Sequence, residues 1–207
     1  LFDLDGTVLN TDQLIFESFR HTFKQFLPEY TLSEEELLSF LGPPLRESFA
    51  RYLSGHQVDE AVEVYRAYNR EKHNDYVTLY PHETEVLKKL HEEGIKMAIV
   101  TTKYKDAAVY GLKCADLDQY FDVVIGSDEV THGKPHPEAL RVALSHLNAT
   151  KGYMIGDNVT DIQAGKNAGI GTIGVTWSLK GTQFLLEEHP DYMMESYDDL
   201  FQYLERM

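Results

Sequence analysis

The stretch Leu1-Phe2-Asp3-Leu4-Asp5-Gly6-Thr7 decides how the rest of this chain is interpreted. Its apolar start is typical of a buried strand, and the aspartates and the glycine come where that strand ends. Because Asp, Gly and Thr are also common turn residues, this stretch alone leaves a structural and a functional interpretation open. The choice depends on which residues stand at the ends of the other apolar runs of the chain.

Short apolar runs alternate with amphipathic segments along most of the chain. We predict strands at residues 1–4, 96–100, 123–125, 153–155 and 171–175, and helices between them at 83–93, 137–147 and 162–168. Gly94 is expected to end the first of these helices. Strands that alternate with helices form β-α-β units, so the pattern predicts an α/β fold with a doubly wound parallel sheet.

The segment from residue 12 to residue 80 breaks this alternation, because it contains helical periodicity and no predicted strand. The periodicity indicates helices at 14–26, 33–41, 45–53 and 58–76. Ser33 and Glu36 have the spacing of a capping box at the start of the second helix. We therefore expect a four-helix insertion at 12–80, placed within an α/β core domain formed by 1–11 and 81–207. Its helically spaced aromatic residues are expected to form a core: Phe16, Phe19, Phe23 and Phe26.

Composition narrows the function classes. The chain has 207 residues, of which 43% are hydrophobic, and it carries a formal net charge of -15. This charge argues against nucleic-acid binding, and no apolar run is long enough to cross a bilayer. The single cysteine, Cys114, is expected to be a small buried side chain, and its solitary occurrence favours a cytoplasmic location. The sequence starts at Leu1 inside a predicted strand, so we expect the natural N-terminus to lie upstream.

Four polar signals each come directly after an apolar run, which places them at the carboxyl edge of the predicted sheet, where ligands bind in open α/β folds. They are residues 3–7, Thr101-Thr102-Lys103, Lys134-Pro135, and Gly156-Asp157-Asn158-Val159-Thr160-Asp161. Carboxylates gathered around Asp3 would repel one another unless a hard divalent cation such as Mg²⁺ held them. Together the four signals indicate a phosphoryl-transfer site.

The residue types assign the chemistry. Asp3 can attack phosphorus to form an aspartyl-phosphate, and Asp5 can act as the general acid and base. Thr101 can donate a hydrogen bond to the phosphoryl oxygens, and Lys134 can place positive charge beside them. The expected activity is Mg²⁺-dependent hydrolysis of a small phosphorylated molecule.

This ordered set of motifs resembles the haloacid dehalogenase superfamily of phosphohydrolases over the whole chain. The resemblance implies Asp3 as the nucleophile, Asp5 as the general acid and base, and Thr101 and Lys134 as phosphate-binding residues. It implies a magnesium site made by Asp3, the backbone carbonyl of Asp5 and the carboxylate of Asp157, with Asp161 as an outer or alternative ligand. It also implies a helical cap that closes over the site. In that superfamily an Asp at the position of Asp5 distinguishes the phosphatases.

Softer motifs resemble the phosphoglycolate phosphatase branch, including its bacterial pyrophosphatases. They are residues 41–45, 100–103 and 174–181. This resemblance implies phosphoglycolate or inorganic pyrophosphate as the substrate. Further substrate contacts are expected from a group of polar, glycine and basic residues, namely Gly6, Thr7, Arg46, Thr102, Lys103 and Asn158. The oligomeric state is left open between monomer and homodimer.

Two other functions fit part of the pattern. A phosphomutase of the β-phosphoglucomutase type would use the same core residues and return the phosphoryl group to a sugar. A receiver-like signalling module also combines an acidic cluster, a phosphorylated Asp, a hydroxyl residue and a Lys, but it has no helical insertion.

Histidines and the single tryptophan are given structural interpretations. The nine histidines show no HxH or HExxH spacing, so we expect solvated or packing roles rather than zinc ligation. Only His136, next to the Lys134 motif, is expected to be near enough to the site to matter. Trp177 is expected to be a core residue.

Overall fold

The computed structural model describes residues 1–204. The chain divides into two compact units, of which the core unit combines Leu1–Asn10 with the chain from Leu79 onward, and the helical unit is Thr11–Thr78. Within the described residues, no helix is long and apolar enough to cross a membrane.

The helical unit contains only helices among its regular elements. They are α1 (Asp12–Phe26), α2 (Glu34–Ser39), α3 (Leu45–Ala50) and α4 (His56–Tyr76). The capping box at the start of α2 is confirmed, because Ser33 N donates to Glu36 Oε2 at 2.8 Å and Glu36 N donates to Ser33 Oγ at 3.2 Å. Each of these two bonds satisfies a backbone donor that the first helical turn would otherwise leave unpaired.

Aromatic side chains hold the helical unit together. Phe19 is fully buried, and its ring stacks on Phe40 at 4.0 Å and lies 5.1 Å from the ring of Phe49. Phe23 is buried in the same cluster, and Phe16 and Phe26 pack against it. The prediction that the helically spaced phenylalanines form a core is confirmed.

A parallel sheet forms the centre of the core unit. Its strands are β1 (Ala98–Val100), β2 (Val123–Ile125), β3 (Tyr153–Gly156), β4 (Gly171–Val175) and β5 (Tyr192–Met194). β1 pairs with β2, and β4 lies between β3 and β5, with every pairing parallel. The parallel α/β prediction is confirmed.

The first residues of the chain join the two halves of this sheet. Phe2 N donates to Ala98 O at 2.8 Å on one side, and Asp3 N donates to Ile155 O at 2.9 Å on the other. The predicted strand over residues 1–4 is reduced to a bridge at Phe2 with one partner in β1 and one in β3. Leu4 already belongs to the following loop, since its carbonyl accepts from Val8 N at 2.9 Å.

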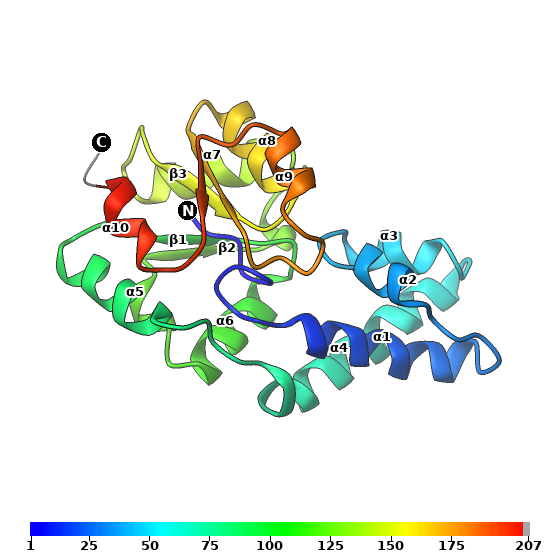
Figure 1. The fold of residues 1–207 in the computed structure, drawn as a ribbon. Coiled ribbons are helices and arrows are strands. Elements are labelled where there is room, and N and C mark those ends of the chain that lie inside the picture. The colour runs from blue at the N-terminus through cyan, green and yellow to red at the C-terminus, as the bar shows by residue number, and fades with distance from the viewer. Residues whose placement is uncertain (205–207) are drawn as a thin grey trace. The chain divides into compact units, whose positions relative to one another are not determined.

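Helices cover both faces of this sheet (Figure 1). α7 (Glu138–His146) and α8 (Val159–Ala168) lie on one side, and α5 (Glu83–Glu92) and α6 (Lys105–Cys114) lie on the other. Shorter elements complete the unit: the 3₁₀ turns Asp118–Tyr120 and Ser127–Glu129, α9 (Gln183–Glu187) and α10 (Asp199–Leu204). Gly94 ends α5 as expected, with a φ of 77° that suits glycine.

Further features of the core unit also differ from the sequence-based expectations. α8 begins at Val159, three residues before the predicted start, because Asn158 caps the helix. β5 was not predicted, since its short run Tyr192–Met194 is only partly buried. Cys114 is exposed rather than buried, and it is the last residue of α6.

Candidate functional site

Asp3 lies where the first segment of the chain leaves the sheet. Its backbone N–H pairs with Ile155 O of β3 at 2.9 Å, so the neighbouring strand fixes its position. Its side chain is 9% exposed. Burial raises the pKa of Asp3 to about 7, although the ammonium of Lys134 acts in the opposite direction. A buried carboxylate of this kind requires nearby positive charge in order to stay ionised.

Lys134 supplies part of that charge from the loop before α7. Its Nζ donates to Asp3 Oδ1 at 2.7 Å, to Asp161 Oδ1 at 2.6 Å and to Val100 O at 3.0 Å. The side chain is 3% exposed. Burial acts to lower the pKa of Lys134, but the carboxylates of Asp161 and Asp3 raise it overall. The ammonium therefore stays charged and links the first segment, the end of β1 and the start of α8.

Asp157 reaches the site from the turn after β3, and Asp161 reaches it from the first turn of α8. Gly156 ends β3, and a Cβ there would lie 2.3 Å from Asp161 Cγ, so only glycine allows Asp161 to pack this closely. Asp161 Oδ2 accepts from Asn158 N at 3.0 Å, which caps α8 and leaves Oδ1 directed toward Lys134. Both aspartates are buried.

The three aspartates form a candidate cation site. Oxygen atoms of Asp3, Asp157 and Asp161 all lie within 4.8 Å of one another. Lys134 pairs with two of these three carboxylates, those of Asp3 and Asp161. Carboxylate oxygens are the ligands that hard divalent cations prefer, so the donor set fits such an ion.

The loop after Asp3 is held against Asp157. Gly6 has a φ of 75°, and a Cβ on it would lie 2.6 Å from Asp157 Oδ2. Its carbonyl accepts a hydrogen bond from Trp177 Nε1 at 3.0 Å. Trp177 is only partly buried, and its indole N–H positions this loop. Its role therefore goes beyond the core packing expected from the sequence.

Asp5 lies in the same loop and pairs with Lys103. Lys103 Nζ donates to Asp5 Oδ1, and both side chains are 19% exposed. Lys103 comes after Thr101 and Thr102 in the turn after β1, where Lys103 N donates to Thr101 Oγ1 at 3.1 Å. The ion pair thus links the turn after β1 to the loop after Asp3.

Asn158 connects Asp157 to a residue that was not predicted. Asn158 Nδ2 donates to Asp157 Oδ1 at 2.8 Å, and Asn158 Oδ1 accepts from Lys180 Nζ at 2.6 Å. This places Asn158 between Lys180 and a candidate metal ligand. The only signal for Lys180 in the sequence was the soft motif at 174–181, in which no residue carries an obvious chemical role.

Other predicted substrate contacts stay predictions. Thr7 is fully buried, and its carbonyl accepts from Tyr197 Oη at 2.8 Å. Thr102 lies half-buried in the turn after β1. Arg46 lies in α3 of the helical unit, exposed and paired with Asp59. None of these contacts identifies a substrate.

This fold, with acidic residues and a lysine at the carboxyl edge of a parallel sheet, is matched by a known family. A model of haloacid dehalogenase-like hydrolases matches residues 1–175. The chain therefore belongs to the haloacid dehalogenase-like hydrolase family, and it is a phosphohydrolase of that family.

Individual relatives cover nearly the whole chain. It is similar to the pyrophosphatase PpaX of Listeria monocytogenes serotype 4b, with 46% identity over 97% of this chain and 93% of that protein. It is 45% identical to the pyrophosphatase PpaX of Anoxybacillus flavithermus over 99% of this chain and 95% of the relative. A haloacid dehalogenase-like hydrolase structure from Streptococcus pneumoniae has a TM-score of 0.86 and 30% identity, covering 98% of this chain and 96% of that one.

Proposed function

We propose that this protein is a Mg²⁺-dependent phosphohydrolase that acts through an aspartyl-phosphate on Asp3, with inorganic pyrophosphate as its preferred substrate. One observation carries the mechanistic part of the proposal. Buried Asp3, Asp157 and Asp161 converge within 4.8 Å of one another, and Lys134 pairs with two of them. This arrangement joins a nucleophile, a cation site and a fixed positive charge.

The donor set supports Mg²⁺ as the cation. Side-chain oxygens of Asp3, Asp157 and Asp161 would hold it, and no nitrogen or sulfur ligand belongs to this group. Magnesium prefers such oxygens and keeps several of its waters. When bound, Mg²⁺ would offset the charge of the carboxylates and of an incoming phosphate.

The protein's own residues would perform the reaction in two stages. Asp3 attacks phosphorus and forms an acyl phosphate, while the bond to the leaving oxygen breaks. Asp5 gives a proton to that leaving oxygen and then takes one from the water that hydrolyses the phosphoenzyme. Thr101 and Lys134 stabilise the charge on the phosphoryl oxygens. Since Lys134 already contacts Asp3, its ammonium also holds the nucleophile in position.

The substrate part rests on similarity to named relatives. Two relatives that share 45–46% identity with this chain over almost its full length are named pyrophosphatases. Pyrophosphate also suits a site that recognises only phosphoryl groups, because its leaving group is itself a phosphate. Phosphoglycolate is the competing substrate.

A turnover screen of the purified chain with Mg²⁺ tests this proposal. The substrates are pyrophosphate, phosphoglycolate, sugar monophosphates and nucleotides, and phosphate release is measured with and without a chelator. We expect the highest kcat/KM with pyrophosphate and no turnover in chelator. If kcat/KM were highest with phosphoglycolate, the proposed substrate would change but the proposed mechanism would stand. Conversion of a sugar monophosphate to its isomer without free phosphate would instead identify a phosphomutase.

A further inference from the structure

A second cluster of possible metal ligands lies on the loop that carries Lys134. His132, His136 and Glu138 each offer one ligand atom, and these atoms lie within 4.8 Å of one another. The two imidazole rings are 4.6 Å apart between centroids. The side chains of His132 and His136 are 62% and 50% exposed, whereas that of Lys134 between them is 3% exposed. The loop thus directs its lysine inward and its histidines outward.

The distances within this cluster fit a bound ion. Nδ1 of His132 and Nδ1 of His136 lie 3.0 and 3.8 Å from Glu138 Oε2. A tetrahedral ion with bonds of about 2.0–2.2 Å to nitrogen and oxygen separates its ligand atoms by roughly 3.3–3.5 Å. The two observed distances lie on either side of that separation, and His132 Nδ1, which is hydrogen-bonded to Glu138 Oε2, would give up its proton to bind the ion.

Surrounding hydrogen bonds hold the ligands in place. Glu138 accepts backbone hydrogen bonds from Thr131 N at 2.9 Å and His132 N at 3.0 Å. His136 Nδ1 accepts a long bond from Glu138 N at 3.3 Å, so its lone pair is free of a proton and would exchange this bond for one to the ion. Asn167 Nδ2 of α8 donates to Pro135 O at 3.0 Å and anchors the loop. Such outer contacts orient ligands in metal sites.

An open surface hollow adjoins the cluster and leaves room for solvent or a further ligand. It has a volume of about 630 Å³, and its lining includes His132, His136 and Asn167. Three protein ligands with an accessible fourth position are typical of open zinc sites. The overall formal charge of -15 also favours cations near the surface.

We propose that His132, His136 and Glu138 form a second metal site, distinct from the aspartate cluster, that binds a divalent transition ion such as Zn²⁺. Imidazole ligands suit Zn²⁺, Ni²⁺ and Cu²⁺, whereas Mg²⁺ prefers oxygen. A bound ion would connect both ends of the loop that carries Lys134. The site does not depend on which phosphorylated substrate the protein hydrolyses.

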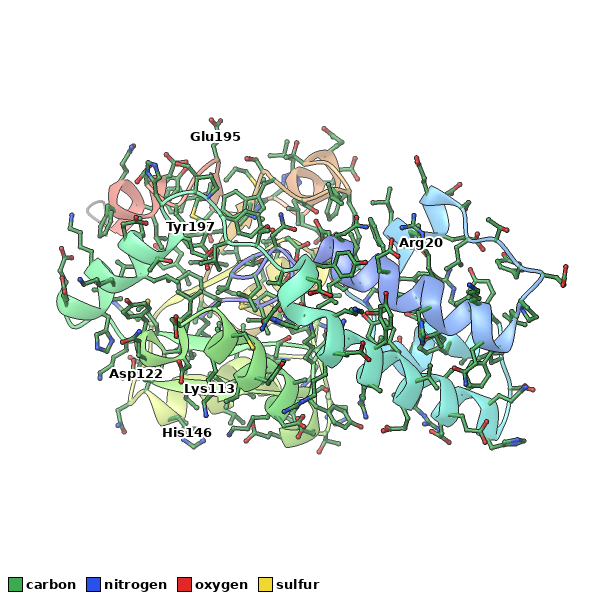
Figure 2. The ribbon with its side chains drawn as sticks, turned by 90° about the horizontal axis from the view of Figure 1, so that it is seen from below. Arg20, Lys113, Asp122, His146, Glu195 and Tyr197 are labelled. Carbon is green, nitrogen blue, oxygen red and sulfur yellow. The ribbon has the colours of Figure 1, made fainter. Side chains whose placement is uncertain are left out.

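The test is Zn²⁺ titration of the full chain by calorimetry in excess Mg²⁺, which occupies the oxygen-only site. Variants His132→Ala and His136→Ala are compared with His146→Ala, a surface histidine at the end of α7 that points outward (Figure 2). Loss of even an outer partner typically lowers metal affinity about 10- to 100-fold, so loss of a ligand should lower it at least about 10-fold. We expect this loss in the first two variants and unchanged affinity in His146→Ala.

Wild-type protein provides a second measurement that requires no variant to fold. Paramagnetic Co²⁺ should broaden the NMR ring signals of His132 and His136 and leave that of His146 sharp. Equal Zn²⁺ affinity in all four proteins would overturn the proposal. Absence of Zn²⁺ binding by the wild-type chain, or sharp His132 and His136 signals in saturating Co²⁺, would do so as well.

Discussion

Lys134 Nζ donates a hydrogen bond to Asp3 Oδ1 at 2.7 Å, although 131 positions separate the two residues in the chain. Both side chains are nearly inaccessible to solvent. A buried charge without a partner is costly, so each residue depends on the other for its charged form. This pair connects the stability of the core unit to the chemistry proposed for Asp3.

Replacing Lys134 tests that connection. We expect Lys134→Met to lower kcat/KM at least about 100-fold, because a fixed charge beside the phosphoryl group is lost. Without Mg²⁺ the free energy of unfolding of the variant should also be about 3 kcal/mol lower than that of the wild type, since Asp3 and Asp161 lose their partner. Activity assays and urea unfolding measure the two effects. Lys105→Met is the control, because its pair with Glu129 is exposed and worth less than about 1 kcal/mol. Equal effects of the two substitutions would contradict the role of Lys134.

Replacing Asp3 tests covalent catalysis. We expect Asp3→Asn to abolish turnover and keep the fold, because asparagine has nearly the same shape but is not a nucleophile. Steady-state assays and circular dichroism provide the measurements, with exposed Asp118→Asn as the control. If Asp3→Asn retained a tenth of the wild-type rate, the aspartyl-phosphate would have to be abandoned.

Replacing Asp5 separates the two stages of the reaction. We expect Asp5→Asn to slow both stages and to allow phosphate linked to Asp3 to be trapped, because one residue exchanges protons in both. Phosphorylation should be impaired less with an activated aryl phosphate, whose leaving group needs no proton. Single-turnover kinetics with an alkyl and an aryl phosphate measure this difference. Equal impairment with both would argue that Asp5 only positions its neighbours.

Lys180 is expected to act through Asn158 on the metal site. Lys180→Met removes the 2.6 Å hydrogen bond to Asn158 Oδ1 and thereby loosens the contact of Asn158 with Asp157. We expect the Mg²⁺ concentration for half-maximal activity to rise about 10-fold, with kcat at saturating Mg²⁺ largely retained. Lys113→Met, at an exposed lysine of α6 (Figure 2), should change neither. A fall in kcat with an unchanged Mg²⁺ requirement would exclude this positioning role.

Glu83 predicts a pH dependence of stability. Burial raises its pKa from 4.5 to about 8, partly offset by the hydrogen bond from Tyr80 N, and Oε1 has no hydrogen-bond partner among the described residues. Because the folded-state pKa lies above the unfolded one, the folded state is favoured at low pH and loses stability as the pH rises from about 4.5 to about 8.

The variant Glu83→Gln should lose this dependence. Between about pH 5 and pH 8, the wild-type free energy of unfolding should fall relative to the variant by on the order of 3 kcal/mol. Urea unfolding at both pH values measures the difference, and Glu85→Gln, an exposed position on the same helix, is the control. Parallel pH profiles for wild type and Glu83→Gln would show that Glu83 does not titrate in this range.

Local patterns in the sequence were sufficient to predict which segments form strands and which form helices. Residues 123–125 and 171–175 form β2 and β4 with the predicted bounds, because short runs that contain β-branched residues favour buried strands. The capping box of Ser33 and Glu36 likewise depends only on neighbouring residues. Predictions based on weak local signals were less successful, since β5 was missed and Cys114 is exposed.

The sequence by itself determined the α/β class, the helical insertion and the aspartates at the strand ends, because these depend on hydrophobic period and short-range spacing. Only the tertiary structure decided which groups meet. It placed Lys134 between Asp3 and Asp161, connected Lys180 through Asn158 to Asp157, and brought two histidines without a recognised spacing onto one carboxylate. The contacts of Lys134 and Lys180 depend on the packing of segments far apart in the chain, whereas the histidine contacts depend on how one short loop folds. No local periodicity encodes side-chain distances of either kind.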